Sequence, residues 1–255
     1  MPNPTIPDEL ICRLRHAERV AVLTGAGISA ESGVPTFRDA VTGLWAHYRP
    51  EDLATPEAYA RDPQLVWNWY QWRRGLVAQA QPNAGHIALA QLEARFPAWT
   101  LITQNVDNLH RRAGSRHVVA LHGDIARTLC SVEGIEVADW PADGPVPPRC
   151  PHCGAGLRPG VVWFGEDLPH AAIDTAFRAA ETCDVFLCVG TSTLVYPAAE
   201  LPFVAHRHRA CVVEINPDET PLSPVADYRL AGPAGVVLPA LVEALAMADA
   251  VTGQA

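Results

Sequence analysis

Five short apolar runs, each followed at once by small or polar residues, constrain the fold of this chain more than any other feature. The runs occupy residues 19–23, 99–102, 117–121, 184–189 and 210–215. Because they are continuously apolar and partly β-branched, they predict strands that are buried on both faces. Helical patterns at 83–96, 168–182 and 238–251 accompany them. The pattern predicts an α/β fold, with a Rossmann-like parallel sheet covered by helices on both faces.

The segments that follow the predicted strands are candidates for a ligand site. They read Thr24-Gly25-Ala26-Gly27, Thr103-Gln104-Asn105-Val106-Asp107, His122-Gly123-Asp124, Gly190-Thr191-Ser192 and Asn216-Pro217-Asp218. Open parallel sheets bind their ligands outside the carboxyl ends of the strands, so we expect these segments to converge on one crevice. Ordinary turns without a ligand are the alternative, because the same residue types also form turns.

Two segments interrupt the succession of strands and helices. Residues 40–80 are rich in tryptophan and helix-like, and residues 127–160 hold Pro, Gly and three cysteines. A chain of 255 residues exceeds the usual size of one domain. We therefore expect a small domain made of a helical module (40–80) and a zinc-ribbon-like module (127–160). The Rossmann-like domain then comprises 1–39, 81–126 and 161–255.

The charge balance excludes several classes of protein. A formal charge of −9 opposes broad binding to a phosphate backbone, so no nucleic-acid partner is expected. All 19 basic residues are arginine. The absence of lysine excludes both a Schiff-base lysine and a Walker-type phosphate loop.

The cysteine count and the hydropathy predict the cellular setting. Seven scattered cysteines, an odd number, indicate thiols or metal ligands and a reducing cytoplasm. No uninterrupted apolar run approaches the roughly 20 residues that span a bilayer, and the N-terminus has no signal-peptide pattern. We therefore expect a soluble, cytoplasmic protein without a membrane partner.

The first post-strand segment continues as a glycine loop. Residues 25–30, Gly-Ala-Gly-Ile-Ser-Ala, satisfy G-x-G-x-x-G/A directly after a predicted strand. Glycine there lets the backbone approach a pyrophosphate, whose charge a helix N-terminus favours. A dehydrogenase would continue into a second strand ending in an acidic residue about 20 positions on. Residues 31–39 instead suit a structured loop, which disfavours hydride transfer; a purely structural glycine turn stays an alternative.

Taken together, these motifs resemble those of the sirtuins, the NAD-dependent protein deacylases. The resemblance covers about residues 20–235, in the family's order. It is carried by residues 25–29, 33–38, 104–107, 122–124, 162–166, 190–192 and 215–216. It implies a protein-lysine deacylase, acting on acylated lysines of other proteins, that transfers the acyl group to ADP-ribose and releases nicotinamide. An NAD glycohydrolase or ADP-ribosyltransferase of the same fold is the alternative.

The resemblance also assigns roles to single residues. His122 would act as the base that takes a proton from a ribose hydroxyl, a step that suits a side chain with a pKa near neutrality. Asn105 and Asp107 would orient the nicotinamide ribose and water, although helix N-capping is an alternative for both. A noncatalytic NAD-responsive module would be expected to lack these three residue types. The implied NAD-contacting residues are Gly25, Ala26, Gly27, Glu31, Thr36, Phe37, Arg38, Trp45, Gln104, Asn105, Asp107, Gly190, Thr191, Ser192, Asn216 and Ala234.

An acyl-binding pair is predicted in the tryptophan-rich segment. Tyr70 and Arg73 are three residues apart and share a helix face. They resemble the sirtuin class III signature that binds the carboxylate of succinyl-, malonyl- or glutaryl-lysine, and guanidinium matches carboxylate in a bidentate fork. Val162 and Phe164 would line the acyl-lysine tunnel beside an edge for a substrate peptide, with apolar core as the alternative.

The cysteines of the 127–160 module predict a structural metal site with an incomplete ligand set. Structural zinc usually takes four ligands from two C-x₂₋₄-C pairs. Cys150 and Cys153 form one pair, but Cys130 is followed by Glu133 where the family has a second cysteine. Three thiolates could be completed by water, His152 or Glu133, or the ribbon could be metal-free.

Overall fold

The computed structural model describes residues 4–35, 48–49, 52–141 and 144–252, which contain a six-stranded parallel sheet. Its spatial order is β3-β2-β1-β6-β7-β8. The strands are β1 (Arg19–Thr24), β2 (Ala98–Thr103), β3 (Val118–Ala120), β6 (Val185–Val189), β7 (Cys211–Ile215) and β8 (Tyr228–Leu230). The Rossmann-like sheet predicted from the apolar runs is confirmed. β8 was not predicted, because three residues at a sheet edge leave too short a pattern.

The strand order reverses at β1, and this reversal determines where the segments that follow the strands meet. The chain builds outward from β1 through β2 and β3, then returns to add β6, β7 and β8 on the other side. Thr24 is paired with Thr103 of β2 and with Val189 of β6, so these three strands end level with one another. The segments that follow them therefore meet at the switch point of the sheet, where α/β proteins bind ligands.

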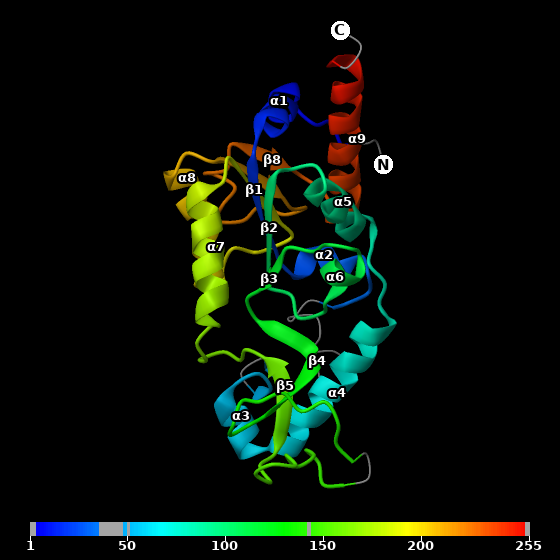
Figure 1. Ribbon diagram of the computed structural model, residues 1–255, viewed down its shortest axis with the longest axis vertical. Coiled ribbons are helices and arrows are strands. Elements are labelled where there is room, and N and C mark those ends of the chain that lie inside the picture. Colours follow the sequence, from blue (N-terminus) through cyan, green and yellow to red (C-terminus); the bar gives the residue numbers. More distant parts are fainter. Residues whose placement is uncertain (1–3, 36–47, 50–51, 142–143, 253–255) are drawn as a thin grey trace.

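Helices cover both faces of the sheet (Figure 1). One face carries α1 (Asp8–His16), α5 (Ala84–Glu93) and α9 (Ala234–Thr252), and the other carries α7 (His170–Thr182) and α8 (Leu201–Arg207). Alternate residues of β1 supply the two cores: Val20 and Val22 pack in the first, and Ala21 and Leu23 in the second. Because both faces are buried, the strands are continuously apolar rather than alternating.

One helix of the described part of the chain, α9, is long and apolar enough over 234–251 to cross a membrane by length and composition. We expected no such segment from the sequence, which has no uninterrupted apolar run of roughly 20 residues. Leu238, Leu241 and Leu245 of this helix pack into the core of the first face. Packing against the sheet accounts for part of the apolar composition of α9.

A second group of elements lies beyond the carboxyl edge of the sheet, at the bottom of Figure 1. It contains α3 (Pro56–Arg61), α4 (Pro63–Gln79) and an antiparallel pair, β4 (Gly123–Cys130) and β5 (Leu157–Val161). Tyr59 of α3 donates from its hydroxyl to the carbonyl of Leu157, 2.9 Å away, which joins the helical and ribbon segments. β4 begins at Gly123, upstream of the expected start of the ribbon at residue 127. The division into the two domains stays a prediction.

Candidate active site

The glycines of the first loop allow two loops to touch at the switch point. A Cβ on Gly25 would lie 2.7 Å from Thr191 Cβ, and one on Gly27 would lie 2.7 Å from the carbonyl oxygen of Gly190. The N–H groups of Gly25 and Gly27 donate to the carbonyls of Val189 and Gly190, at 3.0 and 2.8 Å. Gly190 itself has φ +57°. These glycines are therefore required by loop packing, whatever else they bind.

Hydrogen bonds join all five post-strand segments. Gln104 donates from its backbone to Thr24 O at 3.0 Å and from its side-chain amide to Thr191 Oγ1 at 2.8 Å. Asn216 donates from Nδ2 to Thr191 O at 2.9 Å. His122 Nδ1 lies 2.8 Å from Gln104 O. The segments that sequence reasoning expected at one crevice are in mutual contact at one edge of the sheet.

Ser29, in the short helix α2 (Ala26–Ala30), connects the two predicted polar residues of the second segment. Its hydroxyl donates to Asp107 Oδ2 at 2.7 Å and accepts from Asn105 Nδ2 at 3.1 Å. His86 Nε2 lies 3.5 Å from Ser29 Oγ. Sequence reasoning did not single out Ser29 or His86, because only the fold brings α2, α5 and the second segment together.

Asp107 is 5% exposed, and its charge depends on its neighbours. Burial raises the pKa of its carboxyl; hydrogen bonds from Leu109 N–H and Ser29 Oγ, and the charges of Arg73 and Arg112, oppose the rise. Leu109 is the first residue of α6 (Leu109–Arg112) and donates to Asp107 Oδ1 at 3.0 Å. Asp107 lies one residue before the N-cap of α6, Asn108, so it is not the N-cap itself, although its carboxylate does accept from the first N–H of the helix and is held in place by two donors.

The protonation state of His122 follows from its contacts. A carbonyl oxygen can only accept, so the Nδ1 atom facing Gln104 O carries the proton and Nε2 is the proton acceptor of the ring. Burial lowers the pKa of His122, and the hydrogen bond to Gln104 partly opposes this. A neutral imidazole with a fixed tautomer at the carboxyl edge of the sheet has the properties of a general base.

A second buried histidine lies behind the site. His110 Nε2 is 2.9 Å from Thr24 Oγ1, and Thr24 donates to Thr103 Oγ1 at 2.8 Å. Burial lowers the pKa of His110 to about 3 and that of His86 to about 4, so both rings are neutral. Their ring centroids lie 4.9 Å apart. His110 supports the ends of β1 and β2 through Thr24, whereas His86 contacts Ser29 of α2 and Asn83 at the start of α5.

Several residues expected at NAD have structural contacts in this fold. Glu31 accepts from Gly235 N–H at 2.7 Å, at the start of α9. The helix dipole stabilises a carboxylate at this end of a helix. Ala234 is 4% exposed and packs in the first core. Ser192 is exposed, and the Oδ1 atom of Asn216 accepts from Asp218 N–H at 3.3 Å. The expectations for Thr36, Phe37, Arg38 and Trp45 lie outside the described residues.

Tyr70 and Arg73 of α4 are brought together as their spacing predicts. Tyr70 is 4% exposed and Arg73 is 8% exposed. The Tyr70 hydroxyl accepts from Trp163 Nε1 at 3.1 Å, which leaves its own proton to donate elsewhere. The Arg73 guanidinium lies over the Trp69 ring, 4.9 Å from its centroid. Burial raises the pKa of Tyr70 to about 12, so the pair combines a neutral phenol with a buried cation.

The segment proposed as a peptide edge uses its N–H groups within the chain. Val162 N donates to His122 O at 2.9 Å, Trp163 N to Glu166 Oε2 at 2.8 Å, and Phe164 N to Ala54 O at 3.0 Å. Val162 is partly buried, whereas Phe164 is 49% exposed. The first bond ties this segment to the catalytic histidine candidate. Extended binding of a peptide here would have to use other backbone groups.

The three cysteines of the ribbon also come together. Cys130 ends β4, and Cys150 and Cys153 belong to a turn that faces it. The sulfur atoms and a carboxylate oxygen of Glu133 lie within 4.8 Å of one another. Thiolates and carboxylates are ligands that zinc accepts, so these residues fit the structural metal expected from the sequence.

Fold and site together define an α/β protein in which polar loop segments meet at the carboxyl edge of a parallel sheet, beside the buried imidazole of His122. A model of the Sir2 family matches residues 25–197, and the chain belongs to that family. An NAD-dependent protein deacylase of Methylococcus capsulatus is 53% identical over 246 residues, covering 93% of this chain and 96% of that protein.

Solved structures agree with this assignment. A crystal structure of a Sir2 homolog–NAD complex has a TM-score of 0.89 and 48% sequence identity, covering 96% of each chain. A Sir2 structure with a deacetylated p53 peptide and 3′-O-acetyl ADP-ribose has a TM-score of 0.81 and 29% identity. The match covers 93% of this chain and 97% of that chain.

Proposed function

We infer that the chain is an NAD-dependent protein deacylase, and we propose that the lysine acyl groups it removes include succinyl and malonyl besides acetyl. Relatives that match 90% or more of the chain are named NAD-dependent protein deacylases. Matching structures hold NAD or ADP-ribose. The proposal that succinyl and malonyl groups are removed rests on two side chains of this protein, Tyr70 and Arg73.

The contact between His122 Nδ1 and Gln104 O is the observation that carries the proposed chemistry. NAD, when bound, supplies the ADP-ribose that receives the acyl group. His122 accepts a proton at Nε2, while its Nδ1–H holds the ring in one orientation. Asn105 and Asp107 are hydrogen-bonded to Ser29, which supports fixed positions for their polar atoms in the proposed orientation of the nicotinamide ribose.

Tyr70 and Arg73 support the proposed preference for acidic acyl groups. The Arg73 guanidinium is 8% exposed and presents its N–H donors in a planar fork that matches the two oxygens of a carboxylate. The neighbouring phenol adds a directed donor. An acetyl group leaves the carboxylate position empty, so deacetylation persists alongside desuccinylation.

The test is mass spectrometry of acetyl- and succinyl-lysine peptides incubated with the protein and NAD. We expect loss of both acyl groups, with His122→Ala inactive on both. Arg73→Met should raise KM for the succinyl peptide far more than for the acetyl peptide. Equal effects on both peptides would reject the carboxylate contact. NAD consumption that does not depend on peptide would instead favour a glycohydrolase.

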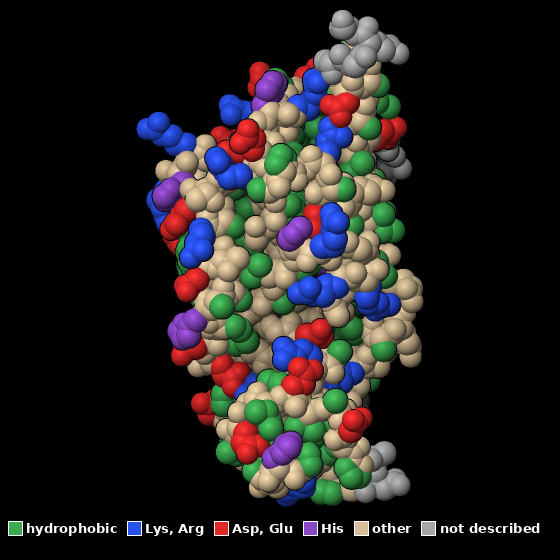
Figure 2. Space-filling model, viewed as in Figure 1, with side chains coloured by type: hydrophobic (Ala, Val, Ile, Leu, Met, Phe, Trp, Pro, Cys, Tyr) green, Lys and Arg blue, Asp and Glu red, His purple; other side chains and the backbone are tan. Residues whose placement is uncertain are grey.

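Acylated lysine side chains of other proteins are the partners we propose. On the face shown in Figure 2, arginine and acidic side chains are interspersed. The cytoplasmic location, and the absence of nucleic-acid and membrane partners, stay predictions.

A further inference from the structure

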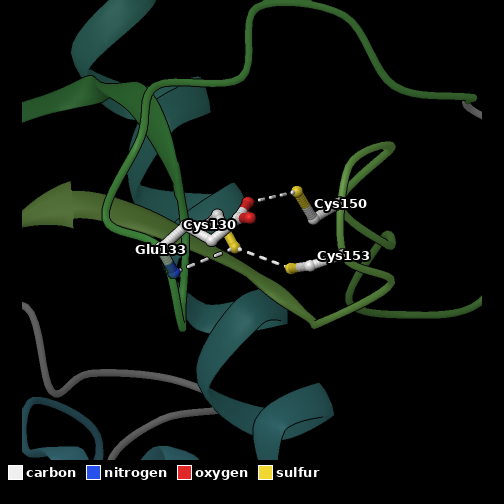
Figure 3. Close-up of side chains that lie close together, drawn as sticks. All are labelled: Cys130, Glu133, Cys150 and Cys153. Carbon is white, nitrogen blue, oxygen red and sulfur yellow. Dashed lines mark hydrogen bonds between the residues drawn. The ribbon is translucent and has the colours of Figure 1, made fainter.

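Glu133 places a carboxylate oxygen beside the three ribbon thiols (Figure 3). Glu133 Oε2 lies 3.6 Å from Cys150 Sγ, and Cys130 Sγ lies 3.4 Å from Cys153 Sγ. The four ligand atoms, one from each residue, are within 4.8 Å of one another. Four donors from two separate turns therefore surround one point.

These separations match the edges of a zinc tetrahedron. With Zn–S bonds of about 2.3 Å and Zn–O bonds of about 2.0 Å, tetrahedral angles place two sulfurs about 3.8 Å apart and a sulfur and an oxygen about 3.5 Å apart. The observed sulfur–oxygen and sulfur–sulfur separations of 3.6 and 3.4 Å are close to both values. The two closest pairs thus have tetrahedral spacing, and all four ligand atoms lie within 4.8 Å of one another.

The backbone explains why residue 133, three positions after Cys130, faces the thiol. Residues 130–135 and 150–155 form the same turn. Cys130 N donates to Ile135 O at 2.9 Å, and Gly134 N donates to Cys130 O at 3.0 Å. Gly134 adopts φ +67°, which glycine tolerates.

The second turn repeats each of these features. Cys150 N donates to Ala155 O at 2.7 Å, Gly154 N donates to Cys150 O at 2.9 Å, and Gly154 has φ +75°. Glu133 therefore occupies in the first turn the position that Cys153 occupies in the second. Each turn offers a donor at its first and fourth residues.

The same comparison argues against His152. His152 is the third residue of its turn and corresponds to Val132, which is 76% exposed. The His152 side chain is also exposed, and it is not one of the four clustered ligands. Exposure alone does not separate the candidates, since Glu133 and Cys153 are exposed too, but the first and fourth residues of each turn form the cluster and the third does not.

We propose that Glu133 is the fourth ligand of a Cys₃Glu zinc site in this chain. A carboxylate oxygen is a harder ligand than a thiolate, and soft ligands select zinc. The Glu133→Cys variant should therefore bind zinc more tightly than the natural chain. The proposal is independent of the proposed deacylase activity.

The test is zinc competition against a chromophoric chelator, with the full chain stripped of metal and refilled. We expect one zinc per chain, and a rise in Kd of about 10-fold or more for Glu133→Ala and Glu133→Gln, since both remove an anionic ligand. Cobalt(II) provides a second readout that does not depend on activity. Its sulfur-to-metal charge-transfer absorption should rise by roughly one third in Glu133→Cys, from three thiolates to four.

His152→Ala is the matched control and should keep both the Kd and the cobalt spectrum of the natural chain. An unchanged Kd in Glu133→Ala would overturn the proposal, and a loss in His152→Ala would assign the imidazole instead. Circular dichroism of each zinc-free variant checks the fold. The stronger absorption expected of Glu133→Cys is a gain of signal, and its absence also counts against the proposal.

Discussion

Single side chains, or their absence, determine how closely the loops of the site can approach. Gly25 and Gly27 contact the segment around Gly190 at distances that no Cβ tolerates. The same loop positions Ser29, whose hydroxyl links Asn105 to Asp107. One added carbon atom in the glycine loop would therefore affect Asn105 and Asp107, which follow β2.

Gly27→Ala should destabilise the protein by about 1–3 kcal/mol, because the added carbon overlaps the carbonyl oxygen of Gly190 at 2.7 Å. Urea unfolding measures the change in free energy. Gly75→Ala is the control: Gly75 lies inside α4 with open space around its Cβ position, so it should gain up to about 1 kcal/mol in helix propensity. Equal changes in the free energy of unfolding for the two substitutions would show that the close contact between Gly27 and Gly190 does not contribute to stability.

The acid limb of the activity profile should reflect His122. Burial lowers the pKa of His122 below its ordinary 6.5, so the neutral base stays populated as the pH falls through 6.5. Activity is lost only at the lower pH at which the folded enzyme protonates this ring. We expect the plot of kcat/KM against pH to bend below pH 6.5. A bend above that value would contradict the assignment of His122 as the base.

Among the elements, α4 joins the predicted acyl-binding pair to the ribbon. It begins with Pro63 after Asp62, whose side chain accepts from Leu65 N–H at 2.9 Å as an N-cap. Trp67 packs with the ribbon cysteines, whereas Tyr70 packs in the core next to the sheet edge. One helix therefore links the cluster under the ribbon cysteines to the predicted acyl-binding pair.

Arg74 is the main polar link between α4 and β4. It donates to Ile125 O and Arg127 O, both at 2.6 Å, and to Thr128 Oγ1 at 3.0 Å. Arg74→Ala leaves two partly buried acceptors, Ile125 O and Thr128 Oγ1, without their charged donor and should cost about 2–3 kcal/mol.

Thermal unfolding measures the effect of Arg74→Ala, with Arg61→Ala on α3 as the control. Arg61 is 61% exposed at its side chain and pairs with Asp52 at 3.8 Å, an interaction worth little at a surface. A melting temperature of Arg74→Ala equal to that of the control would show that the link contributes nothing.

At the scale of the whole molecule, two kinds of core hold the chain together. The sheet is enclosed by two large clusters, one on each face. Ile125 of β4 and Val161 of β5 pack in a third cluster with α4, but the cysteine turns of the ribbon rest on a small cluster. The buried residues of that small cluster are Trp67, Cys130, Val137, Cys150 and Leu157. A core this small stabilises little by itself, so we expect the metal to supply much of the ribbon's stability.

Removal of zinc should therefore unfold the ribbon locally. With a strong chelator present, we expect hydrogen exchange of the backbone amides at 130–137 and 150–157 to accelerate, because their turns lose the ligand bonds. The amides of β1 and β6 should keep their protection, since they lie between the two large cores. Uniform acceleration in both regions would contradict this division, and unchanged protection of the ribbon would show that the metal is not needed for its order.

The sequence predicted the strands and the order of the site motifs well, and it predicted little of what links them. The runs that became β1, β2, β3, β6 and β7 were recognisable because burial on both faces leaves a local apolar signature. β8 and the start of β4 at Gly123 carry no such signature. The roles of Ser29 and His86 depend on contacts between segments more than 50 residues apart.

By itself, the sequence determined the parallel sheet, the glycine turn at its switch point and the candidate base, because apolar runs and turn residues act over a few neighbouring positions. Only the tertiary structure decided between Glu133 and His152 as the partner of the cysteines, and it showed that Glu31 contacts α9 through Gly235. Such contacts depend on how distant segments pack, and packing is a property of the whole chain rather than of any one segment.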